Sequence, residues 1–333
     1  MKKFLKAAAA ALLLFTAGCA KETAAEPETA EEPAAEEEAV TVRVGSMKGP
    51  TTLGLLNMMK KAETEGANKG LYDFNIVTAA DELAAGIIGG DYDIVLVPAN
   101  LASVIYKKTE GGVSVIDINT LGVLYCISAD ESIKGIKDLA GKTVVTTGQG
   151  TTPEYSLRYL LSQYGVDCNI EFKSEAQEVV AAMKEDSSLI AVLPQPFATA
   201  ATISNEELME NFSLNDEWDA LNDGSRLVTG VTIVKNSFLE EHPGAVNTFL
   251  DDHFASVTDA AKDLDGTSEL AAEYGIVEKA PVAKQALPKC GLASIAGDEM
   301  KEALSGYLNV LFNADPASVG GAVPGDDFYY GTK

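Results

Sequence analysis

From residue 41 onward, apolar and polar positions follow two periods along the chain. Short runs with a period of two predict strands, and apolar spacing near 3.6 residues predicts amphipathic helices. Strands that alternate with helices at this interval indicate βαβ units on a parallel sheet. In the first part of the chain the predicted strands are 41–45, 72–77 and 93–97, and the predicted helices are 53–62, 81–88 and 100–108, the last with Asn100 as its N-cap.

The same pattern restarts at Thr143. Strands are predicted at 143–146, 170–172 and 189–193, helices at 153–164 and 176–183, crossing strands at 122–127 and 226–234, and returning helical segments at 237–262 and 297–312. We therefore expect an α/β fold with two lobes, each a mixed sheet of mainly parallel type flanked by helices, and a ligand cleft between them. The expected boundaries are 41–121 plus 229–333 for the first lobe and 122–228 for the second.

The N-terminal segment, residues 1–18, has the order of a lipoprotein signal peptide. A lysine-rich start precedes an apolar run at 7–15 and the small-residue box 16–19, after which a signal peptidase cleaves. The apolar run is too short to span a bilayer as a mature helix. We therefore expect Cys19 to be a lipidated N-terminus that tethers the protein outside the cytoplasmic membrane, at the cell surface or in the periplasm. That location excludes cytoplasmic metabolism and work on nucleic acids.

Residues 19–40 form an acidic segment of Glu, Ala, Pro and Thr, without a large apolar residue before Val40. Such a composition cannot bury enough surface to offset its ordering entropy, so we expect a disordered leash. The formal net charge of the whole chain is −25, which opposes binding to polyanions. The leash supplies part of this charge, and little else follows from it.

Cysteine and histidine positions offer no metal or redox chemistry. Apart from the lipidated cysteine, Cys126, Cys168 and Cys290 are odd in number and widely spaced, so they cannot complete a disulfide framework. We interpret them as buried small apolar residues. His242 and His253 lie in a helical stretch rich in Asp and Glu, and we interpret both as solvated rather than catalytic. No metal and no cofactor are expected.

Two turns, 46–52 and 147–153, follow the first predicted strand of each lobe. In each, glycine lets the backbone approach a ligand, threonine can cap the next helix, and proline fits the first helical turn. A helix that begins this way directs unpaired N–H groups at the edge of the sheet where open α/β folds bind ligands. Either turn alone would favour an ordinary strand-to-helix connection. Their equivalent positions favour a clamp for one small polar or anionic group.

Several motifs occur in an order that is specific although each is weak by itself: Gly90–Asp93, Val97–Asn100, Gly135–Lys142, Gly150–Pro153, Pro194–Ala198 and Pro324–Tyr330. With them the chain resembles type II periplasmic-binding-protein solute receptors of ABC importers, in the NMT1/THI5-like group of nitrate, taurine, aliphatic sulfonate and thiamine-precursor receptors. The resemblance covers about Val40 to Tyr330. It implies a monomeric receptor that captures a small molecule, closes around it by a hinge motion, and delivers it to a permease driven by an ATPase.

The resemblance also implies which residues touch the ligand. The amide and hydroxyl side chains among them offer directional hydrogen bonds, and Met47 and Phe197 offer apolar surface. Lys48 is equally interpreted as a solvated lysine, Asn100 as a helix cap, and Phe197 as a residue packed under the cleft. The expected ligand residues are Met47, Lys48, Gly49, Thr51, Thr52, Pro98, Asn100, Gly148, Gln149, Thr151, Thr152, Gln195, Phe197 and Thr229.

Arginine, the usual bidentate partner of a carboxylate or sulfonate, is absent from every one of these loops. We therefore expect a neutral or zwitterionic heterocycle such as a vitamin precursor, or a small organic anion held by backbone N–H groups and Lys48. An inorganic anion or a sulfonate fits less well.

Two other classes of function use the same lobed fold. A sensory lipoprotein would keep this fold and signal to a partner receptor, and the sequence alone does not separate it from a transport receptor. Some pyrimidine-forming enzymes share the lobed fold, but they use a cysteine-rich loop and a histidine near the cleft. This chain has no two cysteines close together and no GxSxG or HExxH motif, so we expect no enzyme activity.

Overall fold

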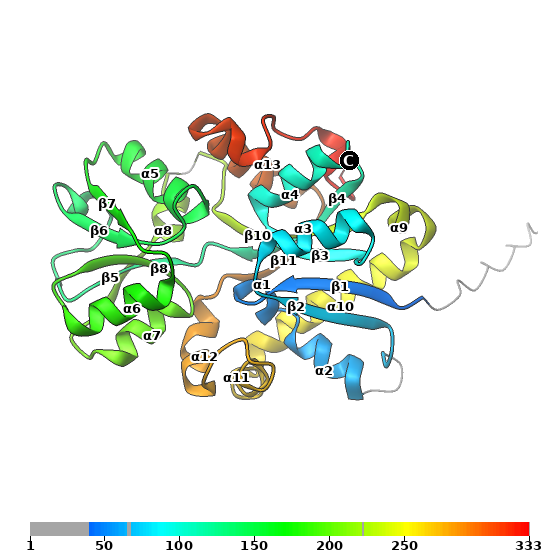
Figure 1. Ribbon diagram of the computed structural model, residues 1–333, viewed down its shortest axis with the longest axis horizontal. Coiled ribbons are helices and arrows are strands. Elements are labelled where there is room, and N and C mark those ends of the chain that lie inside the picture. The colour runs from blue at the N-terminus through cyan, green and yellow to red at the C-terminus, as the bar shows by residue number, and fades with distance from the viewer. Residues whose placement is uncertain (1–39, 65–67, 222, 333) are drawn as a thin grey trace, which may run out of the picture. The chain divides into compact units, whose positions relative to one another are not determined.

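The computed structural model describes residues 40–64, 68–221 and 223–332. In this part of the chain two mixed sheets form, each flanked by helices (Figure 1). The predicted signal peptide, the lipidated Cys19 and the leash up to residue 39 lie outside the described residues.

The first sheet has six strands in the order β11-β4-β10-β3-β1-β2. Strand β1 pairs in parallel with β2 and β3, whereas β10 runs antiparallel between β3 and β4. The bounds are β1 (Val42–Met47), β2 (Tyr72–Val77), β3 (Ile94–Pro98), β4 (Val113–Leu121), β10 (Val228–Lys235) and β11 (Leu292–Ile295).

Helices cover both faces of the first sheet, which explains the continuous apolar run of β3. Val95 and Val97 belong to one apolar cluster with residues of α3, α4 and α13, whereas Ile94 and Leu96 belong to another with residues of α2 and α10. This is the alternation that a strand imposes on its side chains. The helices are α1 (Pro50–Leu53), α2 (Leu56–Thr64), α3 (Ala80–Gly89), α4 (Ala99–Lys108), α9 (Asn236–Glu241), α10 (Pro243–Lys262), α11 (Leu264–Glu273), α12 (Ala280–Ala286) and α13 (Gly297–Ala314), with the 3₁₀ turns η2 (Leu287–Lys289), η3 (Pro316–Val319) and η4 (Asp326–Phe328).

The second sheet has five strands in the order β7-β6-β8-β5-β9. Strand β6 pairs in parallel with β7 and β8, and β5 runs antiparallel between β8 and β9. The elements are β5 (Leu124–Ser128), η1 (Ile136–Leu139), β6 (Thr143–Thr146), α5 (Thr152–Tyr164), β7 (Asn169–Phe172), α6 (Ala176–Glu185), β8 (Ile190–Pro194), α7 (Phe197–Ser204), β9 (Met209–Ser213) and α8 (Leu214–Asp219). Position by position, β7-β6-β8-β5-β9 repeats the arrangement β2-β1-β3-β10-β4 of the first sheet.

The predicted strands and helices all occur, with bounds shifted by a few residues. Two details were wrong. Asn100 does not cap α4, because the helix already begins at Ala99 directly after the extended residue Pro98. The helical segment 237–262 is broken at His242, because Pro243 disfavours helical geometry in the residue before it and starts α10.

Candidate functional site

The first turn, residues 46–52, follows β1 and leads into α1, a helix of only four residues. The hydroxyls of Thr51 and Thr52 both donate to the carbonyl of Met47, at 2.9 and 2.7 Å, and both residues are buried. Thr52 also lies 2.8 Å from the Ser46 hydroxyl. The threonine hydroxyls therefore shape this turn, and Lys48 is the exposed residue at its tip.

Two further predicted segments, 98–100 and 229–230, meet the first turn at the N-terminal end of β10. Gly230 is the register partner of Pro98, and a Cβ atom at Gly230 would lie 2.7 Å from Thr51 Cγ2. Glycine is thus required for the close approach of β10 to the turn. The structure therefore brings three segments together at the carboxyl ends of β1 and β3: 46–52, 98–100 and 229–230.

Near these segments, the side chain of Thr229 has an unsatisfied hydrogen-bonding group. Its Oγ1 atom is buried and has no hydrogen-bond partner among the described residues. A buried hydroxyl that lacks a partner is costly unless water or a ligand supplies one. By contrast, the predicted ligand residue Asn100 already donates its amide to the Ser318 carbonyl, at 3.3 Å.

The second turn, residues 147–153, follows β6 and begins α5 with Thr151 as the N-cap. Gly148 and Gly150 have φ values of 71° and 73°, and the Thr151 hydroxyl donates to the Gly148 carbonyl at 2.7 Å. Gln149 and Thr151 are exposed, whereas Gly148 and Thr152 are half-buried. This second turn therefore presents more accessible surface than the first.

A carboxylate of the chain itself already occupies the start of α5. Glu154 accepts the Gly150 N–H at 2.7 Å and pairs with Arg158 at 2.6 Å. Partial burial acts to raise the pKa of Glu154, but the Gly150 hydrogen bond and Arg158 outweigh it and hold the pKa below its ordinary value. The positive end of the α5 dipole is therefore largely compensated within the protein.

The loop between β8 and α7 contains Gln195 and Phe197. Gln195 is fully buried, accepts from Thr199 N and Oγ1 at 3.2 and 2.8 Å, and donates to Glu210 at 3.0 Å. Its amide is thus occupied by side chains and backbone of the protein. Phe197 is half-buried and packs against an apolar cluster that includes Val145.

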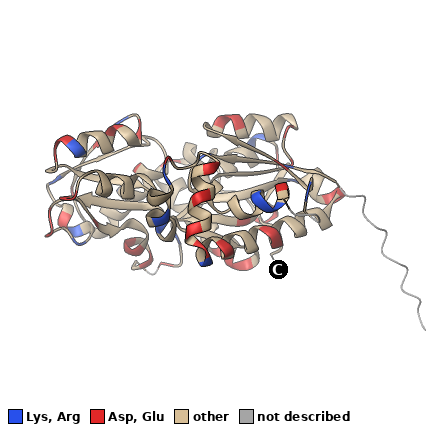
Figure 2. Cartoon of the chain, turned by 90° about the horizontal axis from the view of Figure 1, so that it is seen from below, with Lys and Arg blue, Asp and Glu red and all other residues tan. Residues whose placement is uncertain are grey.

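The arginine side chains are already engaged by carboxylates of the protein. The three arginines form ion pairs with carboxylates: Arg43 with Asp93, Arg158 with Glu154, and Arg226 with Glu299 at 3.5 Å. Figure 2 shows acidic residues spread over helices of both sheets rather than collected in one patch. The charge distribution therefore supplies no arginine fork for an anionic ligand.

Two interpretations of titratable residues change with the structure. His253 is not solvated: its ring is fully buried, and Nδ1 lies 2.6 Å from Asp117 Oδ2. Cys126 and Cys290 are buried as expected, and burial raises the pKa of both thiols, that of Cys290 to about 12 with Glu210 adding to the effect. Cys168 is only half-buried.

A polar seam on β4 was not predicted. Asn119 donates to Thr232 Oγ1 at 3.2 Å and accepts from Thr120 Oγ1 at 2.8 Å, and all three residues are buried. A Cβ atom at Gly230 would lie 2.6 Å from Asn119 Oδ1, so the seam lies directly behind the first turn. The alternation of Asp117 and Asn119 in an otherwise apolar run was the signal that could have revealed it.

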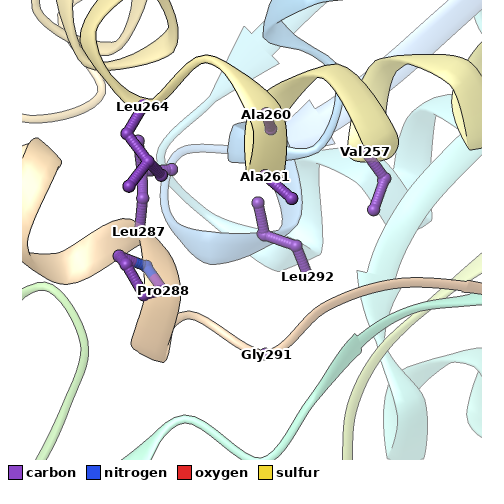
Figure 3. A pocket seen from close by; sticks show the side chains of 8 residues that line it. All are labelled: Val257, Ala260, Ala261, Leu264, Leu287, Pro288, Gly291 and Leu292. Atoms are coloured by element: carbon purple, nitrogen blue, oxygen red, sulfur yellow. The ribbon is translucent and has the colours of Figure 1, made fainter.

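A pocket of about 310 Å³ lies between α10, α11 and the segment from η2 to β11 (Figure 3). None of the predicted ligand residues lines it, and its side chains carry no charge. The pocket offers little directional hydrogen bonding to a polar ligand. Its lining residues are Val257, Ala260, Ala261, Leu264, Leu287, Pro288, Gly291 and Leu292.

Within residues 40–64, 68–221 and 223–332, no cluster of three or more His, Cys, Asp or Glu side chains is arranged to hold a metal ion. Over the same residues, no helix combines the length and the apolar character needed to cross a bilayer.

Solved structures with the same fold include proteins from several organisms. An ABC transporter protein from Parabacteroides distasonis matches with a TM-score of 0.73 and 22% identity, covering 87% of this chain and 98% of the other. The periplasmic aliphatic sulphonate binding protein of Escherichia coli matches with a TM-score of 0.66 and 14% identity, over 83% and 88% of the two chains. The ligand-binding component of an ABC-type import system from Staphylococcus aureus matches at 0.63 and 13%, over 87% and 96%.

The two mixed sheets with their flanking helices thus form a two-lobed periplasmic-binding-protein fold, and the predicted fold class is confirmed. Residues 111–263 match the family model described as NMT1/THI5 like, which confirms the resemblance seen in the sequence. A comparison with curated protein sequences gave no match.

Proposed function

We propose that this protein is an extracytoplasmic solute-binding protein that captures a small molecule and delivers it to the permease and ATPase of an ABC importer. One observation carries this proposal: the turns 46–52 and 147–153 follow topologically equivalent strands, β1 and β6, of two sheets with the same strand arrangement. Open α/β sheets bind ligands at the carboxyl ends of such strands. The functions of the structural relatives are consistent with this role.

The proposal divides the chain into lobes at the two connections between the sheets. The first lobe comprises 41–121 plus 229–333, and the second comprises 122–228. Ligand capture then closes the lobes by a hinge motion at the connections β4–β5 and α8–β10. A ligand drives this closure only as far as it binds the closed state more tightly than the open one. The protein works as a monomer in this scheme.

The proposed ligand is a neutral or zwitterionic organic molecule with a flat or aliphatic part. Every arginine has a carboxylate partner, and Glu154 supplies negative charge at the start of α5. Lys48, exposed at the tip of the first turn, is the one cation of the proposed ligand set. The orphan hydroxyl of Thr229 offers a hydrogen bond, and Met47 and Phe197 offer apolar contact.

The proposal includes a lipid anchor at Cys19. The anchor is supported by the order of three features in the amino-acid sequence: a lysine-rich start, an apolar run and the small-residue box that ends at that cysteine. An anchored receptor would stay close to the permease that it supplies, while the acidic segment that follows would act as the tether.

A thermal-shift screen of the purified protein tests the ligand proposal. Sulfonates, nitrate, amino acids, aromatic acids and heterocyclic vitamin precursors are compared, and a ligand at about 100 times its dissociation constant should add about 2.7 kcal/mol of stability. The matched variants are Gln149→Trp, in the second turn, and Gln285→Trp, an exposed glutamine of α12. The shift should vanish only in Gln149→Trp. Stabilisation by no compound, or an equal shift in both variants, would contradict the proposal.

A further inference from the structure

An ion pair connects the elements of the two sheets. Lys289 lies in η2, on the chain segment that leads into β11 of the first sheet. Glu210 lies in β9 of the second sheet, where it is the register partner of Ile127. Lys289 Nζ pairs with Glu210 Oε2. The pair therefore spans the division between the proposed lobes.

The surroundings of Glu210 make this contact more than a surface ion pair. The Glu210 side chain is 14% exposed, and its other oxygen accepts from Gln195 Nε2 at 3.0 Å and Thr199 Oγ1 at 3.3 Å. The Tyr125 hydroxyl, from β5, donates to the Lys289 carbonyl at 3.3 Å. One carboxylate thus joins the loop before α7 to a lysine of the other sheet's elements. Partial burial weakens the screening that makes exposed ion pairs nearly neutral.

A neighbouring pair serves as a contrast. Lys284 in α12 pairs with Asp265 in α11, so both partners flank the first sheet, and the two side chains are 50% and 75% exposed. Loss of that pair would remove no ion pair between the elements of the two sheets. Loss of Lys289 would remove a charged contact that exists only while η2 and β9 are close.

We infer that the Lys289–Glu210 pair is a latch that holds the two lobes in the arrangement described here and couples their separation to the loop that contains Gln195. This inference rests on the proposed function, since it assumes that the lobes move. When the latch opens, Glu210 loses its cation but keeps Gln195 and Thr199. A ligand that contacts the loop with Gln195 therefore acts on the Glu210 carboxylate, which also controls the separation of the lobes.

The test measures the distance between the lobes without a ligand. Spin labels are attached to ketone-bearing residues introduced at Lys108 in α4 and Glu185 in α6, both exposed, so that the cysteines stay untouched. Double electron–electron resonance is recorded on the full-length protein in detergent at low and high salt. Lys289→Met should add a population at longer distance and weaken the response to salt, to which the more exposed Arg226–Glu299 pair also contributes.

Four further variants complete the design. Glu210→Gln should have the same effect as Lys289→Met, and the double variant should add nothing further. The exchanged variant, Lys289→Glu with Glu210→Lys, should restore the original distribution even if a single variant folds poorly. Lys284→Met should match the wild type. An unchanged distribution in Lys289→Met, or an equal change in Lys284→Met, would overturn the latch. If a ligand from the screen still bound, the solute-receptor proposal would stand without it.

Discussion

His253 Nδ1 lies 2.6 Å from Asp117 Oδ2, and both side chains are completely buried. The contact joins α10 to β4, beneath the seam that supports the first turn. Asp117 Oδ1 and His253 Nε2 have no hydrogen-bond partner among the described residues. The mutual hydrogen bond is thus the main compensation that the two buried groups have for the loss of water.

Removal of one partner of this pair should destabilise the protein strongly. Asp117→Leu or His253→Leu should each cost about 3–5 kcal/mol of unfolding free energy, because the remaining group stays buried without its main partner. The double variant should cost less than the sum of the two. Urea unfolding measures all three, and Asp265→Asn, which breaks an exposed pair, should change stability by at most about 1 kcal/mol. Additive effects at the buried pair would show that it is not coupled.

Thr229→Val should separate binding from stability. The change keeps the shape of the side chain but removes a hydroxyl that has no partner among the residues that the structure describes, so the free energy of unfolding should not fall. Binding of the ligand found in the screen should weaken by about 1–2 kcal/mol in calorimetric titration. Thr232→Val is the matched change, because it breaks a hydrogen bond with Asn119 and should lower stability. Wild-type affinity in Thr229→Val would place the site elsewhere.

The protein should lose stability steeply in alkaline solution. Burial raises the pKa of Tyr125 and Tyr155 to about 12, with Glu210 and Asp315 adding to the effect, and the hydrogen bond to Asp327 with burial raises that of Tyr106 to about 12. The unfolded chain releases these protons near pH 10, so the stabilisation is complete below that pH and is lost as the pH rises through about 12.

The measurement is urea unfolding between pH 9 and about 12, together with phenolate absorbance. Tyr155→Phe should make the fall in unfolding free energy with pH less steep, because one native-state proton no longer contributes. Equal slopes in the variant and the wild type would show that Tyr155 titrates alike in both states.

Cys19→Ala should abolish lipid attachment. The variant is expected to keep residues 1–18 or to be released from the membrane fraction, since the signal box needs the cysteine for modification. Mass spectrometry of the N-terminal peptide and fractionation of cells check both results. An unmodified wild-type protein that retains residues 1–18 would refute the anchor.

The sequence allowed most of the parallel βαβ framework to be predicted, because β3 and β6 are short apolar runs between clear turn signals. Strand β4 was missed as a separate element. Its apolar pattern is interrupted by Asp117 and Asn119. Their hydrogen-bond partners, His253 and Thr232, are more than 100 residues away in the sequence. Their alternation is a signal for a strand, but only the assembled fold shows which partners allow these polar residues to be buried.

The candidate site was predictable only in part. The two turns could be located because glycine, threonine and proline act through local geometry. The state of Gln195 could not, because its amide is engaged by Glu210, which is 15 residues away and carries no local sign of that role. Asn100 was misplaced as a cap for a related reason: whether α4 starts at residue 99 or 101 depends on how β3 ends.

In the sequence, the strands of the second sheet are inserted between β4 and β10 of the first sheet, and this insertion has a consequence for the order of folding. All strands of the second sheet are contained in residues 124–213, whereas β10, which lies between β3 and β4, is not complete until Lys235. During synthesis, which starts at the N-terminus, the chain can therefore complete the second sheet while the first sheet still lacks its central strand β10. Leu121 and Val228, the register partners on either side of the insertion, meet only when that strand arrives. The first sheet is thus completed late and by pairing between strands far apart in the sequence. Until β10 pairs with them, the facing sides of β3 and β4 stay exposed.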